Sequence, residues 1–572
     1  MSVHNADIAA LFQRMADLLD IEGANPFRVR AYRRAAATIG ELPESVASLI
    51  ERGEPLETLP AIGDDLAEKI VEIVRTGRLK ALEEVEARTP STLAALTAIP
   101  GLGPKRVHAL HQELGIRTLA DLEAAAKAGR LRDLPKFGAA IEAKILDDIA
   151  KHRTTEKRFS IALAEEFARD LTRYLSAAPG ATRVVVAGSY RRRRETVGDL
   201  DLLVICDDGP ALTDYFVRYD EIAEVVSKGP TRSTVILTSG IQVDLRVVPE
   251  ESYGTALHYF TGSKAHSIAI RTILQDKGLK LNEYGVFKGK ERVGGESEED
   301  VFRAAGLGYI EPELREDRGE IEASKAGMLP KLITLADIRG DLHAHTDASD
   351  GRSSLEEMAE AARALGYDYL AVSDHSQHVI VANGLDPERL ARQLDEIDRL
   401  NDRFDGFRLL KSCEVDILAD GTLDLPDSIL KRLDYTVCAV HFGFDFDSDR
   451  QTERILKAMD NRYFNILAHP TGRLIGQRPG YGLDLDRIIE GARVRGCFLE
   501  INAHPMRLDL DDIRCRQAKE AGVRLAISTD AHSTVGLGAM RYGVDQARRG
   551  WIEAGDVLNT RPWKELKALF DR

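Results

Sequence analysis

One polar segment between two apolar runs, residues 188–201, constrains the fold more than any other part of the chain. The runs at 184–187 and 202–205 are typical of buried strands, so the segment connects two strands. Asp199 and Asp201 lie two positions apart at the start of the second strand, where the period of two places both carboxylates on one face. Like charges this close repel each other unless a hard cation lies between them, which predicts a site for Mg²⁺ or Mn²⁺.

A third carboxylate and a phosphate-binding pattern accompany this pair. Residues 241–247 alternate, with apolar side chains at the odd positions, so Asp244 points away from the apolar face. Gly188 and Ser189 offer an uncrowded backbone and a hydroxyl to phosphate oxygens, and Arg192 offers a fork of donors. Asp-x-Asp alone is more often an exposed acidic turn. The combination of three carboxylates, two metal ions and a phosphate cradle predicts phosphoryl or nucleotidyl transfer.

Together these motifs resemble the nucleotidyltransferase signature of family X DNA polymerases, the group that includes DNA polymerase beta. The sequence Tyr-Phe-Thr-Gly-Ser at 259–263 is similar to the family's nucleotide-pocket turn. The resemblance implies that Asp199, Asp201 and Asp244 hold two Mg²⁺ or Mn²⁺ ions, one of which activates the primer 3′-hydroxyl. It also implies a nucleotide pocket formed by Gly188, Ser189, Arg192, Tyr259, Phe260, Gly262, Ser263 and Arg271. Ser267 departs from the family, because relatives have an Asn there that contacts the incoming base, and the change would weaken nucleotide affinity.

Composition bounds the size and the location of the protein. The 572 residues are enough for about four domains, and no apolar run approaches the ~20 residues of a membrane span. The first residues lack the layout of a signal peptide and the five cysteines show no close pairing. We therefore expect a cytoplasmic, nucleoid-associated protein without disulfides or a zinc finger. The net charge of −15 does not exclude DNA binding, because a local basic strip can hold phosphates while another domain carries the acid.

A related pattern recurs three times in the first 150 residues. The segments 59–70, 99–105 and 134–145 each predict a helix, a tight glycine turn and a second helix. They resemble the helix-hairpin-helix, in which amides at the start of the second helix meet a DNA phosphate without reading sequence. A plain helix-loop-helix with a glycine cap is the alternative for any single copy. Only the second copy has both glycines, since Ala61 and Lys136 replace the first glycine elsewhere. The residues expected at the DNA backbone are Gly63, Gly101, Gly103, Lys105 and Gly138.

A lysine in the same region is a candidate for a second activity. By the resemblance, Lys69 falls where family X polymerases carry the Schiff-base lysine that removes a 5′-deoxyribose phosphate. Arg28 and Tyr32 fall near the family's phosphate-binding and supporting positions. An amine nucleophile needs a lowered pKa, which the acidic residues Asp65 and Glu68 oppose. A surface helix lysine is therefore the alternative.

Most histidines of the chain lie beyond residue 338, where they follow another pattern. Apolar strands separated by helical segments end at or near each candidate ligand except Asp350, which implies a parallel α/β barrel with its site at the C-terminal rim. So many ionisable groups at one rim need metal to compensate them, and mixed imidazole and carboxylate ligands suit two or three Zn²⁺, Mn²⁺ or Fe²⁺ ions. The candidate ligands are His343, His345, Asp350, His375, Glu414, His441, His469, Asp530 and His532. This set resembles the ligands of the PHP (polymerase and histidinol phosphatase) domain, whose members are phosphoesterases.

These resemblances cover nearly the whole chain and divide it into six parts. We expect a multidomain α+β and α/β protein with helical N-terminal domains, a nucleotidyltransferase palm and thumb, and a distorted TIM-like barrel at the end. The expected parts are a lyase-like helix-hairpin-helix domain at 1–85, a DNA-binding helix-hairpin-helix (fingers) domain at 86–150, the palm at 151–255, the thumb at 256–318, a linker at 319–337 and the PHP domain at 338–572.

The resemblance implies a DNA polymerase that fills short gaps in base excision repair and carries a phosphodiester-hydrolysing PHP domain. The expected activities of the PHP domain are exonuclease trimming of 3′ ends, cleavage at abasic sites and removal of 3′ phosphates. The expected partners are gapped or nicked double-stranded DNA and dNTPs, with no membrane and with the chain as a monomer. Two alternatives remain open: a repair nuclease whose polymerase half serves mainly as a DNA clamp, and a non-catalytic repair scaffold.

Overall fold

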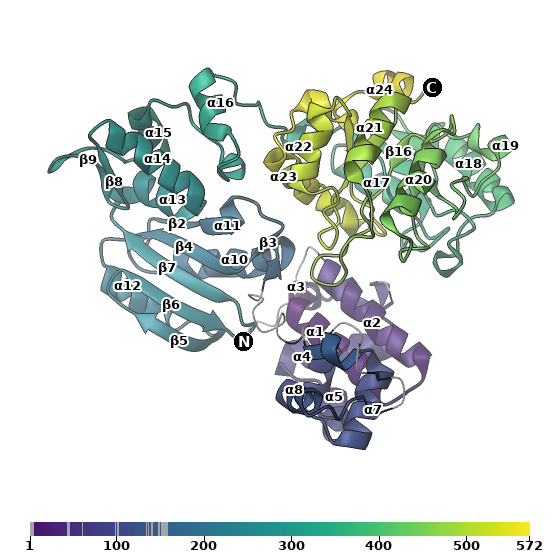
Figure 1. The fold of residues 1–572 in the computed structure, drawn as a ribbon, viewed down its shortest axis with the longest axis horizontal. Helices are drawn as coiled ribbons and strands as arrows, with labels where there is room; N and C mark the ends of the chain where they lie inside the picture. The colour runs from purple at the N-terminus through teal and green to yellow at the C-terminus, as the bar shows by residue number, and fades with distance from the viewer. Residues whose placement is uncertain are drawn as a thin grey trace. The chain divides into compact units, whose positions relative to one another are not determined.

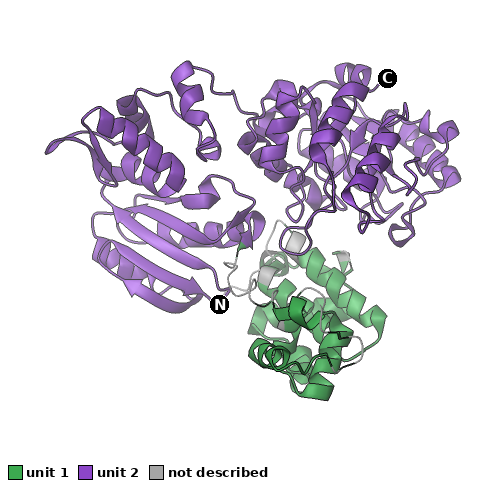
Figure 2. Ribbon diagram, in the orientation of Figure 1, with its two compact units in different colours: residues 1–158 green, residues 159–572 purple. Residues whose placement is uncertain are grey.

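The computed structural model divides the chain into two compact units, residues 1–158 and 159–572 (Figure 2). The structure describes residues 5–42, 46–59, 61–97, 99, 102–132, 134, 137–138, 141–146, 149 and 158–571. Among these residues, no helix combines the length and the apolar character that crossing a membrane requires.

The first unit is helical. Its helices are α1 (Asn5–Ile21), α2 (Pro26–Glu41), α3 (Val46–Glu51), α4 (Asp64–Thr76), α5 (Lys80–Glu86), α6 (Thr92–Leu96), α7 (Pro104–Leu114) and α8 (Leu119–Lys127), with a 3₁₀ turn η1 (Leu56–Thr58). Ile8, Phe12 and Met15 recur along α1 at helical spacing and are fully buried. Asn25 caps the start of α2, because its side chain accepts a hydrogen bond from a backbone N–H of the first turn. Since α2, α5 and α7 all pack on α1, that helix forms the centre of the unit.

The second unit begins with a five-stranded sheet in the order β2-β4-β7-β6-β5. Its strands are β2 (Arg183–Val186), β4 (Asp199–Ile205), β5 (Ile222–Lys228), β6 (Arg232–Leu237) and β7 (Gln242–Val248). β4 and β7 are parallel, and the other neighbours are antiparallel. Because side chains alternate along a strand, Leu202 and Leu245 face α10 (Ile161–Ser176) and α12 (Gly209–Phe216), while Leu203 faces the opposite side.

A short connection and a helical layer complete this half of the unit. The helix α11 (Gly188–Arg191) and the strand β3 (Thr196–Val197), which pairs with β1 (Phe159–Ser160), lie between β2 and β4. The next elements are α13 (Tyr253–Thr261), α14 (Lys264–Asp276), β8 (Lys280–Asn282), β9 (Gly285–Lys288), β10 (Glu291–Gly294) and α15 (Glu298–Ala305). Ile270, Leu274 and Phe302 form their buried core. α13 packs on the sheet face that carries Leu203, so this layer covers the face opposite α10.

Residues from Gly340 onward form a barrel of parallel strands. They are β11 (Gly340–Asp341), β12 (Tyr369–Val372), β13 (Arg408–Lys411), β14 (Glu414–Asp416), β15 (Val437–Ala439), β16 (Ile466–Leu467), β17 (Phe498–Asn502) and β18 (Leu525–Ser528). Every pairing within β11-β12-β13 and within β14-β15-β16-β17-β18 is parallel. Parallel bridges from Ala344 to Ala531 and from His375 to Glu414 join the two sheets. The predicted parallel α/β barrel is thus confirmed.

Helices surround the barrel and its interior is filled. The helices are α17 (Leu355–Ala364), α18 (Pro387–Asn401), α19 (Asp427–Leu430), α20 (Ser448–Met459), α21 (Leu485–Arg495), α22 (Asp512–Glu520), α23 (Met540–Arg549) and α24 (Trp563–Phe570) (Figure 1). Alternate strand residues such as Tyr369, Ala371 and Val437 share one cluster with Leu566 and Phe570 of α24. The other strand residues pack against the surrounding helices. The barrel is therefore a packed core, and polar groups gather only beyond the strand ends.

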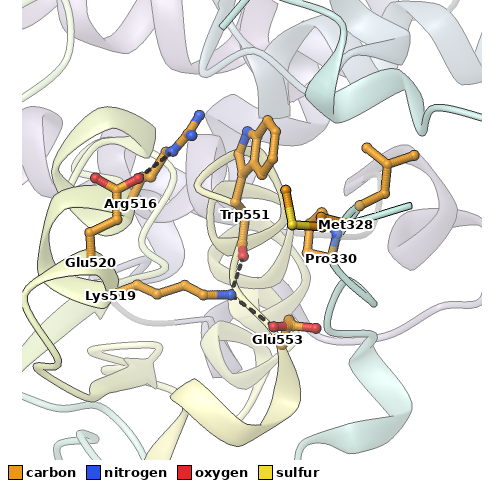
Figure 3. Close-up of a pocket in the computed structure, with 8 residues that line it drawn as sticks. Met328, Pro330, Arg516, Lys519, Glu520, Trp551 and Glu553 are labelled. Carbon is orange, nitrogen blue, oxygen red and sulfur yellow. Dashed lines mark hydrogen bonds and ion pairs between the residues drawn. The ribbon is translucent and has the colours of Figure 1, made fainter. Parts of the chain in front are cut away.

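In the segment before the barrel, α16 (Glu320–Ala326) packs through Ile321 on the core of α14 and α15, and η4 (Leu335–Asp337) contacts α23 of the barrel. Met328 and Pro330 line a small pocket of about 270 Å³ whose other wall includes Lys519 and Trp551 (Figure 3). The Lys519 ammonium donates to the carbonyl oxygen of Trp551 (2.8 Å) and pairs with Glu553 (3.0 Å) (Figure 3). Because its ionic groups are paired with one another, we assign this pocket to packing of the segment and not to catalysis.

Candidate active sites

Asp199 and Asp201 of β4 lie beside Asp244 of β7. The register pairs Asp201 with Asp244 on neighbouring strands, which are about 4.8 Å apart in a sheet. Burial raises the pKa of Asp201 to about 7, and repulsion from Asp199 and Asp244 adds to the effect. Since Asp201 and Asp244 alternate with Leu202 and Leu245, they point away from the α10 face. The structure therefore brings together the three carboxylates that the sequence singled out.

Neighbouring residues hold this acidic cluster in place. Thr234 Oγ1 and Gln242 Nε2 donate to the two oxygens of Asp244 (2.6 and 2.7 Å), which fixes the orientation of that carboxylate. A Cβ on Gly188 would lie 2.2 Å from Asp201 Oδ2, and the φ of Gly188 is +62°. Only glycine fits both requirements, so Gly188 permits the close approach of Asp201 to the turn between the strands.

Arg192, the expected phosphate-binding arginine, is engaged inside the protein. Its Nε donates to Glu316 (3.1 Å), and its Nη1 donates to the carbonyl oxygen of Thr261 (2.6 Å). The side chain is buried, whereas Ser189, in the first turn of α11, is half-buried. A phosphate would therefore have to compete with Glu316 for the guanidinium.

The segment 259–263 combines a helix end with a turn. Tyr259 and Phe260 belong to the last turn of α13, which ends at Thr261 and is capped by Gly262. Ser263 caps α14 by accepting a backbone N–H with its hydroxyl, so the chain turns at Gly262 and Ser263. Tyr259 is exposed, contacts the Phe260 ring edge to face (5.1 Å between centroids) and lies 5.9 Å from the Arg271 guanidinium. These three side chains form one surface.

The glycines of the first unit present open helix starts. Gly63 and Gly103 precede α4 and α7 without a side-chain cap, and nothing lies within 4 Å of the position of a Cβ on either. Lys105 is exposed in the first turn of α7, and the carbonyl of Gly138 accepts the N–H of a residue four positions later. Gly101 lies outside the described residues. Leu66 and Arg106 donate their amides to the carbonyls of Gly63 and Gly103 (2.9 Å each), and Pro104 has no N–H. The amides at the very start of each helix, those of Asp64, Asp65 and Lys105, are therefore the ones placed to meet a phosphate.

The three residues considered for lyase activity, Lys69, Arg28 and Tyr32, differ in their exposure and in their contacts. Lys69 pairs with Asp65 one turn earlier in α4 and also donates to the Asp65 carbonyl (3.3 Å). Arg28 is exposed, but Tyr32 is buried, with its ring edge to face with Phe12 (5.6 Å between centroids). Tyr32 therefore packs between the helices. The Lys69 amine is paired with Asp65, and this ion pair would have to break before Lys69 could act as a Schiff-base nucleophile.

The nine candidate ligands beyond residue 338 gather at one end of the barrel. Among the described residues, three groups have ligand atoms that all lie within 4.8 Å of one another. The groups are His345, Asp350, His375 and His532; His343, His345 and Asp530; and His375, Glu414 and His441. His469 joins them, because its Nε2 lies 2.9 Å from Glu414. Since His345 and His375 each belong to two groups, the nine side chains form one continuous site.

The donor atoms of this site fit metal ions. The Nε2 atoms of His343 and His345 lie 3.1 Å apart, and the buried Nδ1 of His345 has no hydrogen-bond partner in the part of the chain that the structure describes. Burial alone would raise the pKa of Glu414, but the surrounding imidazoles outweigh it and lower that pKa well below its usual range. The imidazole nitrogens within 3.5 Å of Glu414 belong to His343, His345, His375, His441 and His469. Convergent nitrogens around an ionised carboxylate form a donor set typical of zinc, manganese or iron.

Two acidic residues that sequence reasoning missed orient these histidines. Glu500 lies 2.8 Å from Nδ1 of His343, and Asp416 lies 3.0 Å from Nδ1 of His441. Each contact fixes the ring and leaves Nε2 directed into the site. The available signal was an acidic residue inside an apolar strand, since Glu500 lies within β17 and Asp416 ends β14.

Four families match separate parts of the chain. Residues 3–79 match the helix-hairpin-helix domain, and residues 93–151 match the SAM-like helix-hairpin-helix tandem. Residues 256–316 match the DNA polymerase beta thumb, and residues 341–504 match the PHP domain. The PHP match begins at the first ligand-bearing strand and includes seven of the nine candidate ligands, while Asp530 and His532 lie beyond it.

Similar proteins cover either the whole chain or one of its halves. DNA polymerase/3′-5′ exonuclease PolX of Bacillus subtilis is 39% identical over 574 residues, which span 100% of both proteins. A probable phosphatase of Thermoanaerobacter is 29% identical over 41% of this chain and 94% of its own length. DNA polymerase lambda of Arabidopsis thaliana is 27% identical over 54% of this chain and 62% of its own length. The full-length match and the order of the families show that the chain belongs to the bacterial family X DNA polymerases with a C-terminal PHP domain.

Proposed function

We propose that the chain is a DNA-directed DNA polymerase that fills short gaps in base excision repair and hydrolyses phosphodiesters in its PHP domain. The observation that carries the proposal is the presence of two candidate metal centres in one unit: three carboxylates on β4 and β7, and nine histidine and carboxylate side chains at the barrel rim. The full-length relative is named for both activities, which supports the pairing. We propose gapped or nicked double-stranded DNA and dNTPs as substrates. We also propose that the protein is a monomer and that it acts on nucleoid DNA in the cytoplasm.

We propose the same division of labour along the chain as the sequence suggests. The parts are a lyase-like domain at 1–85, a DNA-binding domain at 86–150, a palm at 151–255, a thumb at 256–318, a linker at 319–337 and a PHP domain at 338–572. The family matches to the hairpins, the thumb and the PHP domain support this division. Lyase chemistry at Lys69 stays a prediction, and the ion pair with Asp65 weighs against it.

In the polymerase half, each group has a distinct role. We assign Asp199, Asp201 and Asp244 to two Mg²⁺ or Mn²⁺ ions, which when bound favour ionisation of the primer 3′-hydroxyl and balance the charge of the triphosphate. Ser189 and Arg192 bind the triphosphate oxygens through a hydroxyl and a guanidinium. The remaining pocket residues that contact the nucleotide or the template are Gly188, Tyr259, Phe260, Gly262, Ser263 and Arg271.

In the PHP half, the nine ligands hold two or three Mn²⁺, Zn²⁺ or Fe²⁺ ions, which when bound activate water and neutralise a phosphodiester. The main activity that we assign to this half is trimming of 3′ ends. Cleavage at abasic sites and removal of 3′ phosphates are further proposed activities. The probable phosphatase that matches this half supports phosphoester hydrolysis as its chemistry. Glu500 and Asp416 hold the rings of His343 and His441, so that Nε2 of each stays directed at the site.

One assay tests both halves together. A primer with a one-nucleotide gap, dNTPs and Mn²⁺ should yield extension by one residue, and the same primer without dNTPs should be shortened from its 3′ end. Shortening without extension under both conditions would favour the alternative of a nuclease with a DNA clamp. The absence of both extension and shortening would favour the alternative of a non-catalytic repair scaffold. The variants that separate the two centres are described in the Discussion.

Replacing Arg507 with alanine should weaken 3′ trimming without removing metal. Its Nε lies 3.5 Å from Asp530, and the side chain is partly exposed at the rim, so it can donate to a phosphate held at the site. We expect kcat/KM for trimming to fall by about 10²-fold, the effect of losing one charged donor at a developing negative charge. Elemental analysis should show unchanged metal content, and Arg507→Lys should retain part of the activity. Loss of metal in Arg507→Ala would contradict this role.

Replacing Lys105 with alanine should weaken DNA binding equally for all sequences. Because Lys105 is exposed in the first turn of α7, it can contact one phosphate. The slope of log K against log salt concentration should fall in magnitude by about 1. Fluorescence anisotropy with gapped DNA at several salt concentrations measures this slope. Lys127→Ala is the matched control, since Lys127 pairs with Glu123 on α8, and it should leave the slope unchanged.

A further inference from the structure

Arg549, the last residue of α23, links the PHP barrel to the turn that carries the phosphate-binding residues. Only 5% of the residue is exposed. Its Nη1 donates to the carbonyl oxygen of Arg192 (2.7 Å) and to Oε1 of Glu316 (3.0 Å). Its Nη2 donates to Asp512 (2.6 Å) at the start of α22. One side chain of the barrel therefore holds both the backbone of Arg192 and the carboxylate that binds the Arg192 side chain.

Glu316 lies between two guanidinium groups. The Nε of Arg192 and the Nη1 of Arg549 donate to the same oxygen, Oε1 of Glu316, at 3.1 and 3.0 Å. Burial alone would raise the pKa of Glu316, but Arg192 and Arg549 outweigh it and lower that pKa. Arg194 contributes little, since its nearest contact with Glu316 is 3.9 Å. Glu316 is therefore an ionised carboxylate whose side chain is only 9% exposed, and its charge is offset by the two guanidinium groups.

This arrangement bears on the release of Arg192 to a nucleotide. To bind a triphosphate, Arg192 has to turn away from Glu316, and a buried carboxylate left without a partner opposes that movement. With Arg549 in place, Glu316 keeps one guanidinium. We propose that Arg549 is a positioning residue for nucleotide binding, which keeps Glu316 paired so that Arg192 can pass to the triphosphate. The inference rests on the proposed role of Arg192 in the polymerase half.

Arg549→Met tests the inference, because methionine keeps the bulk of the stem and removes the charge. We expect the KM for dNTP in single-nucleotide gap filling to rise about 10-fold, while kcat stays within about 2-fold of wild type. Arg549→Lys should retain a KM near that of wild type. Arg548→Met is the matched control, because Arg548 lies on the same helix but pairs with Glu313 (2.7 Å), and it should leave KM unchanged.

A second variant separates positioning from damage to the fold. Adding Glu316→Gln to Arg549→Met removes the charge that retains Arg192, so KM should return to within about 3-fold of wild type. If the double variant stays as impaired as Arg549→Met, the role of Arg549 is structural and the inference is wrong. If Arg192→Ala raises KM and Arg549→Met leaves it unchanged, the inference falls while the proposed nucleotide site stands. If Arg192→Ala leaves KM unchanged, the proposed role of Arg192 itself is wrong, and the inference falls with it.

Discussion

Asp201→Asn will abolish nucleotide addition at a primed gap and leave 3′ trimming intact. Asparagine has the shape of the aspartate but lacks the charge that two divalent ions require beside the triphosphate. We expect the gap-filling rate to fall by at least about 10³-fold, since metal-assisted charge stabilisation contributes several kcal/mol to such a reaction. Extension and shortening of a labelled primer, followed in the same protein preparation with and without dNTPs, measure both rates.

The same substitution should raise thermal stability when metal is absent. Burial raises the pKa of Asp201 to about 7, with added repulsion from Asp199 and Asp244, so its charged form opposes folding at neutral pH. Removing that charge should stabilise the metal-free protein by roughly 1–2 kcal/mol, measured as an increased Tm in EDTA. If the charge of Asp201 instead stabilised the fold, Asp201→Asn would lower the Tm in EDTA. Asp199→Ala should also abolish extension alone, and extension that survives either change would overturn the assignment of the three carboxylates.

The barrel and the clustering of its candidate ligands could be predicted because each ligand except Asp350 lies at or near a strand end. His375, Glu414 and His441 follow apolar strands, and parallel strands place their carboxyl ends at one rim. Period-two alternation likewise predicted that Asp199 and Asp201 share one face and that Asp244 points away from the apolar face of its strand. That the two strands are neighbours did not follow from alternation, and the family resemblance alone implied that the three carboxylates meet.

The contacts that could not be predicted join residues far apart in the chain. Arg192 and Glu316 are 124 positions apart, and Arg549 lies 357 positions beyond Arg192. A charged residue on a loop has no periodicity that points to its partner, so the arginine run from residue 191 suggested a solvated phosphate binder. The extent of α13 was not predictable for another reason. Gly262 and Ser263 signal a turn, but they do not show how far the preceding helix extends.

Glu414→Gln will abolish 3′ trimming and reduce the metal content of the protein while gap filling persists. Glu414 lies within 3.5 Å of nitrogens from five histidines, so its charge serves more of the site than any other single ligand. Glutamine keeps the volume but offers one neutral oxygen acceptor. We expect trimming to fall by at least about 10³-fold, as for loss of a ligand that holds a catalytic ion. Elemental analysis of the purified protein should show at least one ion fewer per chain than in wild type.

Asp201→Asn and His343→Ala are the controls for this result. Asp201→Asn should retain the full metal content of the PHP site after dialysis against dilute chelator, because its ligands lie elsewhere in the unit. His343→Ala should resemble Glu414→Gln, since His343 contacts Glu414 and is held by Glu500. Gap filling by Glu414→Gln and His343→Ala, and 3′ trimming by Asp201→Asn, report whether the unit is folded in each preparation. Normal metal content in Glu414→Gln, together with normal trimming, would show that the histidines at the rim serve the fold alone, because a catalytic metal site cannot lose its central anion without effect.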